Sequence, residues 1–276
     1  MRQIETNGTA LHVVESGPEG APAVVFLHAL GADLRIWDPV VARLPAGLRC
    51  VRMDMRGQGL SAGPPAPYAM GALVGDAEGV MEALGLRGAV VVGLSIGGMI
   101  AQGLAVKRPD LVGGLVLSNT GAKIGTPEMW EQRIEAARAG GLEALADATM
   151  ERWFAEPFRS GPEAALIRRM FVRQPLEGWV GCAAAISGTD FYTPTSGLRL
   201  PALGIAGDRD GSTPPDLVRE TAELIPGARV EVMRGSGHLP CIDAPGDYAA
   251  LLAGFLGEIG HGEIGHGEIG HGEGAT

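Results

Sequence analysis

Residues 89–98 read AVVVGLSIGG, and this stretch decides the fold that the sequence predicts. Its first half is a continuous apolar run, which is typical of a strand buried on both faces of a parallel sheet. Its second half fits G-x-S-x-G and leads into an apolar helical pattern. In such a strand-to-helix turn the serine is exposed as a nucleophile, and the flanking glycines let the backbone pass without a Cβ clash. We therefore predict that Ser95 is a catalytic nucleophile.

Apolar runs of the same kind occur on both sides of this stretch. They lie at 23–28, 48–54, 114–119, 202–207 and 228–233, with helical patterns at 37–44, 70–84, 96–108, 215–224 and 246–256. Strands that alternate with helices predict crossover connections and a mostly parallel sheet with helices on both faces. Residues 3–15 instead alternate in polarity around Asn7-Gly8, which indicates a β-hairpin. The expected fold class is α/β.

The alternation of strands and helices stops between residues 122 and 192, where the pattern is helical throughout. Thr126 and Pro127 are typical of an N-cap and a first helical residue, and Gly140-Gly141 of a helix end. We expect this helical insertion to form a cap over the carboxyl edge of the sheet, where ligands bind in open α/β sheets. The predicted domains are a core of residues 1–121 and 193–256 and a cap of residues 122–192.

Residues 257–276 are a near-perfect repeat of Gly-Glu-Ile-Gly-His. Two glycines in every five residues disfavour a helix, and one isoleucine per repeat offers little apolar surface to bury. We therefore expect a solvated tail. The alternative is weak binding of a divalent metal by the spaced histidines and glutamates.

The charge and composition exclude several classes of function. The formal net charge is −10, and removing the four tail glutamates leaves about −6 for the body (−10 + 4). Nucleic-acid binding requires clusters of Lys and Arg, and the sequence contains no such cluster. No apolar run is long enough to span a membrane, and the polar N-terminus does not resemble a signal peptide. Three cysteines cannot all pair, so we expect free thiols in a reducing compartment. Together these observations predict a cytoplasmic protein without membrane or nucleic-acid partners.

A serine hydroxyl becomes a good nucleophile only when a base takes its proton. His238 follows the last predicted strand, where the chain order serine, acid, histidine requires the base. The loop after the preceding strand, AGDRDGSTPP, offers Asp208 and Asp210 as the acid that orients the imidazole. We predict Asp210, because a residue a few positions beyond the strand can reach over the sheet edge. Asp208 beside Arg209 is more typical of a turn.

The tetrahedral intermediate of acyl transfer needs two backbone N–H donors. One is predicted to be the N–H of Ile96, the residue after the nucleophile, and the other the N–H of Leu30. Leu30 lies in the loop after the first buried strand, where Ala29 stands in place of the glycine of His-Gly-x-Gly segments. His28 is interpreted as structural. No metal or cofactor is expected at this site.

The segments that carry these residues are similar to the α/β-hydrolase superfamily over nearly the whole chain. They are FLHALG, DMRGQGLS, GLSIGG, IAGDRDGSTPP and GSGHLPCIDAP. Within the superfamily the chain resembles the 3-oxoadipate enol-lactonases of the β-ketoadipate pathway, including the cap segments LADATMERWF and EGWVGCAAAISGTDF. The resemblance implies that Ser95, Asp210 and His238 hydrolyse an enol lactone through an acyl-enzyme.

The lactone implied by this resemblance carries a carboxylate, which requires a cation in the cap. Trp130 and Arg133 share a helical face by their i, i+3 spacing. We expect Trp130 to pack on the substrate and Arg133 to bind its carboxylate. The alternative is that Arg133 extends along the helix surface to water.

Other functions are compatible with the same residues. A general carboxylesterase or a cofactor-free perhydrolase would use the same three residues, so the sequence separates them poorly from an enol-lactonase. A ligand-binding receptor that retains the three residues is an alternative of a different class. Turnover of a simple aryl ester would distinguish an enzyme from a receptor. The expected partner is a small lactone or ester, and the sequence does not predict an oligomeric state.

Overall fold

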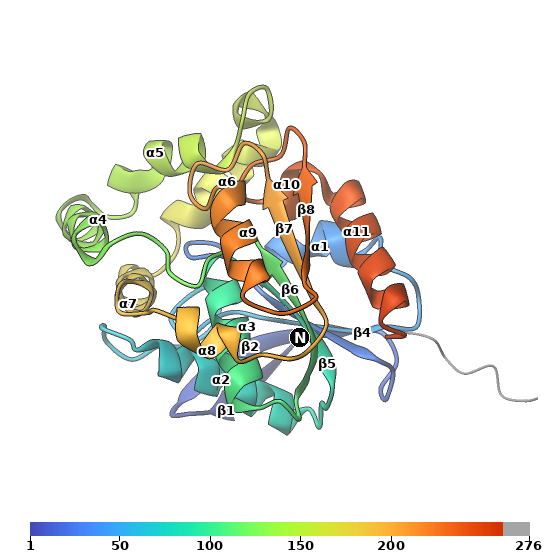
Figure 1. The fold of residues 1–276 in the computed structure, drawn as a ribbon. Helices are drawn as coiled ribbons and strands as arrows, with labels where there is room; N and C mark the ends of the chain where they lie inside the picture. The colour runs from blue at the N-terminus through green and yellow to red at the C-terminus, as the bar shows by residue number, and fades with distance from the viewer. Residues whose placement is uncertain (262–276) are drawn as a thin grey trace, which may run out of the picture.

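An eight-stranded sheet forms the centre of the molecule in the computed structural model, which describes residues 1–261 (Figure 1). The strands are β1 (Arg2–Thr6), β2 (Thr9–Ser16), β3 (Ala23–Leu27), β4 (Arg49–Met53), β5 (Ala89–Leu94), β6 (Val112–Ser118), β7 (Ala202–Gly207) and β8 (Arg229–Met233). Their order is β1-β2-β4-β3-β5-β6-β7-β8. The pairs β1–β2 and β2–β4 are antiparallel, and the others are parallel. The predicted mostly parallel sheet is confirmed.

The N-terminal hairpin and the buried strands follow from local sequence. Asn7 and Gly8, between β1 and β2, have φ values of 48° and 72°, and two consecutive positive φ angles suit a tight hairpin turn. All residues of β3, β5 and β7 are buried, which explains why these strands read as continuous apolar runs.

Helices cover both faces of the sheet. The 3-10 helix η1 (Leu34–Trp37), α1 (Asp38–Val41), the short α10 (Pro240–Asp243) and α11 (Pro245–Glu258) pack together. The helices α2 (Met70–Ala83), α3 (Ile96–Lys107) and α9 (Pro215–Glu223) lie on the other face (Figure 1). The sequence predicts these helices apart from η1 and α10, each only four residues long.

A helical segment connects β6 to β7. It contains α4 (Pro127–Gly140), α5 (Glu143–Trp153), the 3-10 helix η2 (Phe158–Ser160), α6 (Pro162–Val172), α7 (Leu176–Ser187) and α8 (Tyr192–Ser196). The Thr126 hydroxyl accepts a hydrogen bond from the N–H of Met129, so this residue caps α4 as expected. We call α4 to α7 the cap helices; they gather at one end of the sheet (Figure 1).

Helix α8 spans the predicted boundary between cap and core at residues 192 and 193. It packs against α3 rather than with the cap helices, and the Thr195 hydroxyl donates to Gln102 Oε1 at 2.8 Å. The division of the chain into core and cap domains therefore stays a prediction.

The first residues of the C-terminal repeat are helical, contrary to the prediction. Helix α11 continues through Gly257 to Glu258, Ile259 packs against the core, and His261 Nε2 donates to the carbonyl of Ala23 at 2.9 Å. These tertiary contacts outweigh the helix cost of a glycine, which is about 1 kcal/mol. The expected solvated tail otherwise concerns residues 262–276, which lie outside the described residues.

These contacts predict different results for two truncations. Removing residues 257–276 should destabilise the protein by about 1–3 kcal/mol, because an apolar contact of Ile259 and a hydrogen bond of His261 are lost. Removing only residues 262–276 should leave the melting temperature unchanged, since their composition offers little to bury. Thermal unfolding of both variants checks this. A shorter truncation that destabilises as much as the longer one would contradict it.

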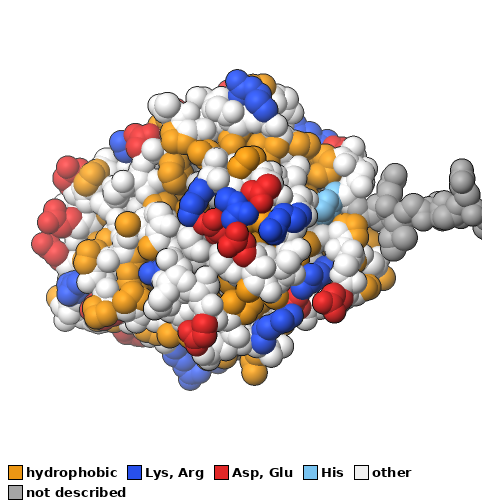
Figure 2. Space-filling view, turned by 90° about the horizontal axis from the view of Figure 1, so that it is seen from below, with side chains coloured by type: hydrophobic (Ala, Val, Ile, Leu, Met, Phe, Trp, Pro, Cys, Tyr) orange, Lys and Arg blue, Asp and Glu red, His pale blue; other side chains and the backbone are white. Residues whose placement is uncertain are grey.

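The described residues carry no helix that is long and apolar enough to cross a membrane. On the face of the molecule shown in Figure 2, basic and acidic side chains are interspersed, and the basic ones do not form a continuous patch. Among the ion pairs of the described residues, Arg108 pairs with Glu78, Glu82 and Asp110. The three cysteines are buried and unpaired, as expected.

Candidate active site

Ser95 lies at the turn between β5 and α3, with φ of 59° and ψ of −119°. A non-glycine residue with positive φ is strained, and such strain concentrates at functional sites. The flanking glycines make the turn possible, because a Cβ on Gly93 would come within 2.3 Å of the Gly97 carbonyl oxygen. A Cβ on Gly97 would lie equally close, 2.3 Å, to the carbonyl oxygen of Leu27. The strand, turn and helix expected for the motif are present.

His238 and Asp210 meet from the loops that follow β8 and β7. His238 Nδ1 donates to Asp210 Oδ2 at 2.8 Å, and the two side chains are only 3% and 0% exposed. This bond fixes the proton on Nδ1 and leaves Nε2 as an acceptor. Asp208 instead is exposed and accepts the N–H of Gly235 at 2.7 Å. The structure thus brings Asp210, and not Asp208, to the histidine.

Further hydrogen bonds hold the Asp210 carboxylate in place. The Asn119 amide and the Thr213 hydroxyl donate to Oδ2 at 2.8 and 2.7 Å, and the N–H groups of Ser212 and Thr213 donate to Oδ1 at 2.7 and 3.1 Å. Burial raises the pKa of Asp210, but the charge of His238 and these donors outweigh it and leave the pKa below its usual value. The carboxylate therefore stays ionised.

The sequence reasoning missed Asn119 and Thr213. Asn119 follows directly after β6 and has φ of 43°. Because the carboxyl ends of parallel strands form the ligand-binding edge, its position at this edge could have indicated it. Thr213 lies three residues after Asp210, but nothing in the pattern marks it as a donor to the carboxylate.

The end of cap helix α5 touches both loops. The carbonyl of Trp153 accepts the N–H of His238 at 2.8 Å, and the carbonyl of Arg152 accepts the N–H of Gly211 at 2.9 Å. A Cβ on Gly237 would lie 2.0 Å from the carbonyl oxygen of Trp153, so only glycine allows this approach. The cap segment therefore helps to set the positions of His238 and of the Asp210 loop.

The loop after β3 keeps a defined shape although Ala29 replaces the usual glycine. His28, which is fully buried, donates from Nδ1 to the Ala29 carbonyl at 2.9 Å and accepts the N–H of Met55 on Nε2 at 3.0 Å. The N–H of Gly31 donates to Gln58 Oε1 at 2.7 Å. His28 thus braces the loop from within, in line with the structural role expected for it.

The two backbone N–H groups predicted as oxyanion donors are those of Leu30 and Ile96. Leu30 lines the same cavity as Ser95, and Ile96 is the first residue of α3, whose N–H has no acceptor within its helix. Neither N–H donates to another of the described residues. The helix N-terminus adds a partial positive charge, which favours an anion at this point.

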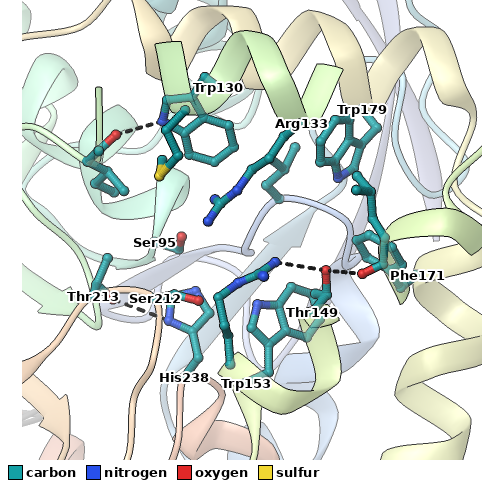
Figure 3. A pocket seen from close by; sticks show the side chains of 16 residues that line it. Ser95, Trp130, Arg133, Thr149, Trp153, Phe171, Trp179, Ser212, Thr213 and His238 are labelled. Atoms are coloured by element: carbon teal, nitrogen blue, oxygen red, sulfur yellow. Dashed lines mark hydrogen bonds between the residues drawn. The ribbon is translucent and has the colours of Figure 1, made fainter. Parts of the chain in front are cut away.

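A cavity opens between the core and the cap helices, with Ser95 and His238 on its core side (Figure 3). Its lining contains no acidic residue among those described and consists of Leu30, Ser95, Ile124, Gly125, Met129, Trp130, Arg133, Leu145, Thr149, Arg152, Trp153, Phe171, Trp179, Ser212, Thr213 and His238. No hydrogen bond joins Ser95 to His238 in this structure. Such contacts often tighten only when substrate binds.

Trp130 and Arg133 line this cavity side by side. The Trp130 indole donates to the carbonyl of Ile124 at 2.7 Å, and the Arg133 guanidinium carbon lies 4.9 Å from the centre of the Trp130 ring. Figure 3 shows the Arg133 side chain extending into the cavity rather than along the outer surface of α4. Burial, and then the charge of Arg152, lower the pKa of Arg133 to about 10, so it remains a cation at neutral pH.

Comparison with known proteins defines the class of protein to which this fold and site belong. The profile of the family described as alpha/beta hydrolase fold matches residues 22–245. The chain belongs to this family. The predicted α/β-hydrolase fold is confirmed.

Within the alpha/beta hydrolase family, the chain is similar to enol-lactonases and to an esterase. The chain is 31% identical to 3-oxoadipate enol-lactonase 1 of Acinetobacter baylyi, over 91% of this chain and 95% of that protein. The crystal structure of the enol-lactonase from Burkholderia xenovorans LB400 is 36% identical, with a TM-score of 0.89 over 93% of this chain and 100% of that one. A malate-bound thermophilic esterase from Thermogutta terrifontis is 28% identical, with a TM-score of 0.88 over 95% and 100% of the two chains.

These relatives confirm the resemblance to 3-oxoadipate enol-lactonases that the sequence indicates. The chain is a hydrolase that acts on ester or lactone bonds. This favours an enzyme over the alternative of a ligand-binding receptor.

Proposed function

We propose that this protein hydrolyses a carboxylate-bearing enol lactone, 3-oxoadipate enol-lactone, to the open keto acid, 3-oxoadipate. The observation that carries the proposal is a cavity with Ser95 and His238 on one side, a half-buried Arg133 on another, and no acidic residue in its described lining. The same proposal includes a role in the breakdown of aromatic compounds, which the resemblance to the enol-lactonases of the β-ketoadipate pathway implies. It also includes the cytoplasmic location expected from the sequence.

In the first half of the reaction, Ser95 attacks the lactone carbonyl carbon while His238 Nε2 takes the hydroxyl proton. The carbonyl oxygen becomes an oxyanion, which the N–H groups of Leu30 and Ile96 stabilise. Asp210 holds the imidazole in orientation and stabilises the imidazolium. The ring C–O bond then breaks, the enolate leaves, and His238 returns the proton. The enol becomes a ketone, and the acyl group stays on Ser95.

In the second half, His238 takes a proton from water, and the hydroxide attacks the acyl carbon. The ester bond to Ser95 breaks, and the serine oxygen recovers its proton from His238. An enolate is a better leaving group than an alkoxide, so the first half needs less general-acid help than ester hydrolysis. None of these steps calls for a metal or cofactor.

Substrate orientation is assigned to Trp130 and Arg133. The indole is fixed by its hydrogen bond to Ile124, so it presents a rigid apolar surface on which a flat lactone ring can pack. The guanidinium next to it meets the carboxylate, and a charge-assisted hydrogen bond in a partly dry cavity is stronger than one in water.

The second candidate is a general carboxylesterase, which the 28% identity to a thermophilic esterase favours; a perhydrolase would use the same residues. Wild-type turnover of the enol lactone and of p-nitrophenyl acetate, measured side by side, tests the choice. The proposal expects a much larger kcat/KM for the lactone. A preference for the neutral ester would make the protein an esterase and contradict it.

Arg133→Met is expected to lower kcat/KM for the anionic lactone by roughly 10- to 100-fold, because a charge-assisted hydrogen bond is worth about 1.5–3 kcal/mol. It should hardly change turnover of p-nitrophenyl acetate, since Ser95 and His238 are untouched. Steady-state kinetics on both substrates measure this contrast.

The matched control is Arg138→Met on the same helix, where Arg138 is exposed and lies 4.0 Å from Glu177. This variant should keep both activities. If Arg133→Met lowers both activities together, Arg133 is structural rather than a carboxylate-binding residue.

A further inference from the structure

A second arginine faces the cavity, and the proposed mechanism does not use it. Arg152, in the last turn of α5, lines the cavity together with Arg133 from α4. Two other arginines on the cap helices pair with carboxylates: Arg138 with Glu177, and Arg168 with Glu143. Among the described residues, no acidic side chain forms a salt bridge with either cavity arginine. The neighbouring Glu151 acts on Arg152 only through its charge, so the cavity holds two positive charges with no acidic residue in its described lining.

Arg152 is held in an ordered position close to the reacting groups. Its Nη2 donates to the Thr149 hydroxyl at 3.1 Å, and that hydroxyl donates to the carbonyl of Leu145 at 2.7 Å. The next residue, Trp153, accepts the N–H of His238 and has its ring centre 6.0 Å from that of His238. Arg152 therefore extends from the point where α5 meets the His238 loop.

Two unpaired, half-buried arginines are unfavourable for the empty protein. Burial lowers the pKa of both side chains, and the charge of Arg152 lowers that of Arg133 further. Taking a cation out of water without a partner costs free energy, which an anionic ligand can recover. A ligand with one carboxylate supplies one negative charge against the two positive charges of the cavity.

The proposed reaction itself produces a second carboxylate. Addition of water breaks the C–O bond of the lactone ring, and the new carboxylic acid loses its proton at neutral pH. A monoanionic lactone thus becomes a dianionic keto acid, which matches the two cavity arginines in charge.

We propose that Arg152 is a specificity-determining residue for ligands with two carboxylates, so that the cavity binds short dicarboxylates, the reaction product included, more tightly than matching monocarboxylates. This inference rests on the proposed function for the origin of the second carboxylate. Arg133 binds one carboxylate and Arg152 the other, and product accumulation slows turnover by competition.

The test is isothermal titration calorimetry of the wild-type protein with adipate and with hexanoate, which differ only in a carboxylate that replaces a methyl group. Adipate is expected to bind at least about tenfold more tightly, the effect of one charge-assisted hydrogen bond. Arg152→Met should weaken adipate binding roughly tenfold or more and change hexanoate binding little. Arg138→Met should change neither.

Equal affinity for the two acids in the wild type, or an equal loss for both in Arg152→Met, would overturn the inference. If Arg152→Met does not fold, the salt dependence of adipate and hexanoate binding to the wild-type protein tests the inference instead. Salt screens two ion pairs more than one, so adipate affinity should fall more steeply with salt than hexanoate affinity, and parallel slopes count against the inference. Because binding needs no turnover, a protein that binds adipate through Arg152 but does not hydrolyse the lactone would refute only the proposed function.

Discussion

Ser95→Ala is expected to lower kcat/KM for the lactone by at least about 10⁴-fold, because the acyl-enzyme can no longer form. The melting temperature should change little, since the substitution removes only one hydroxyl and keeps the backbone hydrogen bonds that hold residue 95 in place. The N–H of Ser95 donates to the Ser118 carbonyl at 3.0 Å, and its own carbonyl accepts the Thr120 hydroxyl at 2.6 Å. Steady-state kinetics and thermal unfolding together measure this separation of activity from stability.

The control for this variant is Ser196→Ala at the end of α8, where an exposed hydroxyl donates to the Thr193 carbonyl. It should keep full activity. Near-normal activity of Ser95→Ala would show that another group is the nucleophile, and a large loss of stability would mean that the activity loss reports unfolding.

Asp210→Asn should lower kcat by about 10⁴-fold, whereas Asp208→Asn should lower kcat by less than roughly tenfold. Five donor groups point at the Asp210 carboxylate: the imidazole of His238, the amide of Asn119, the hydroxyl of Thr213 and two backbone N–H groups. An amide has a single oxygen acceptor, so its NH₂ must face some of these donors in either orientation. If the NH₂ faces His238, the imidazole must accept on Nδ1 and loses its acceptor at Nε2.

Asp208→Asn makes the same change of charge in the same loop. Asp208 accepts one backbone N–H, that of Gly235, a bond that an asparagine oxygen can preserve. Kinetics of the two variants on one substrate compare them directly. Reversed effects would mean that the wrong aspartate has been assigned to His238.

Much of the fold could be predicted because each element carries a local signal. The strands β5 and β7 are found at the predicted bounds, since a strand buried on both faces must be apolar at every position. The turn at Ser95 was predictable because two glycines are needed for its close backbone contacts. The meeting of His238 with Asp210 followed from chain order, which a parallel sheet converts into neighbouring loops at one edge.

The remaining features depend on contacts between distant segments. Asn119 is 91 residues from the carboxylate to which it donates, and no periodic pattern records such a pair. Arg152 lies in a helix with ordinary charge spacing, and only the packing of α5 against the two loops turns its side chain into the cavity. The extension of α11 into the repeat likewise depends on contacts of Ile259 and His261 that local helix propensity does not include.

The most direct test of the account is covalent labelling of the wild-type protein with an organophosphonate ester, followed by intact-mass measurement and peptide mapping. The account predicts one adduct per chain, located on Ser95, with complete loss of lactone hydrolysis, and no adduct on Ser95→Ala. An adduct at another residue that abolishes activity, or full activity of a protein labelled at Ser95, would contradict the assignment of Ser95 as the nucleophile.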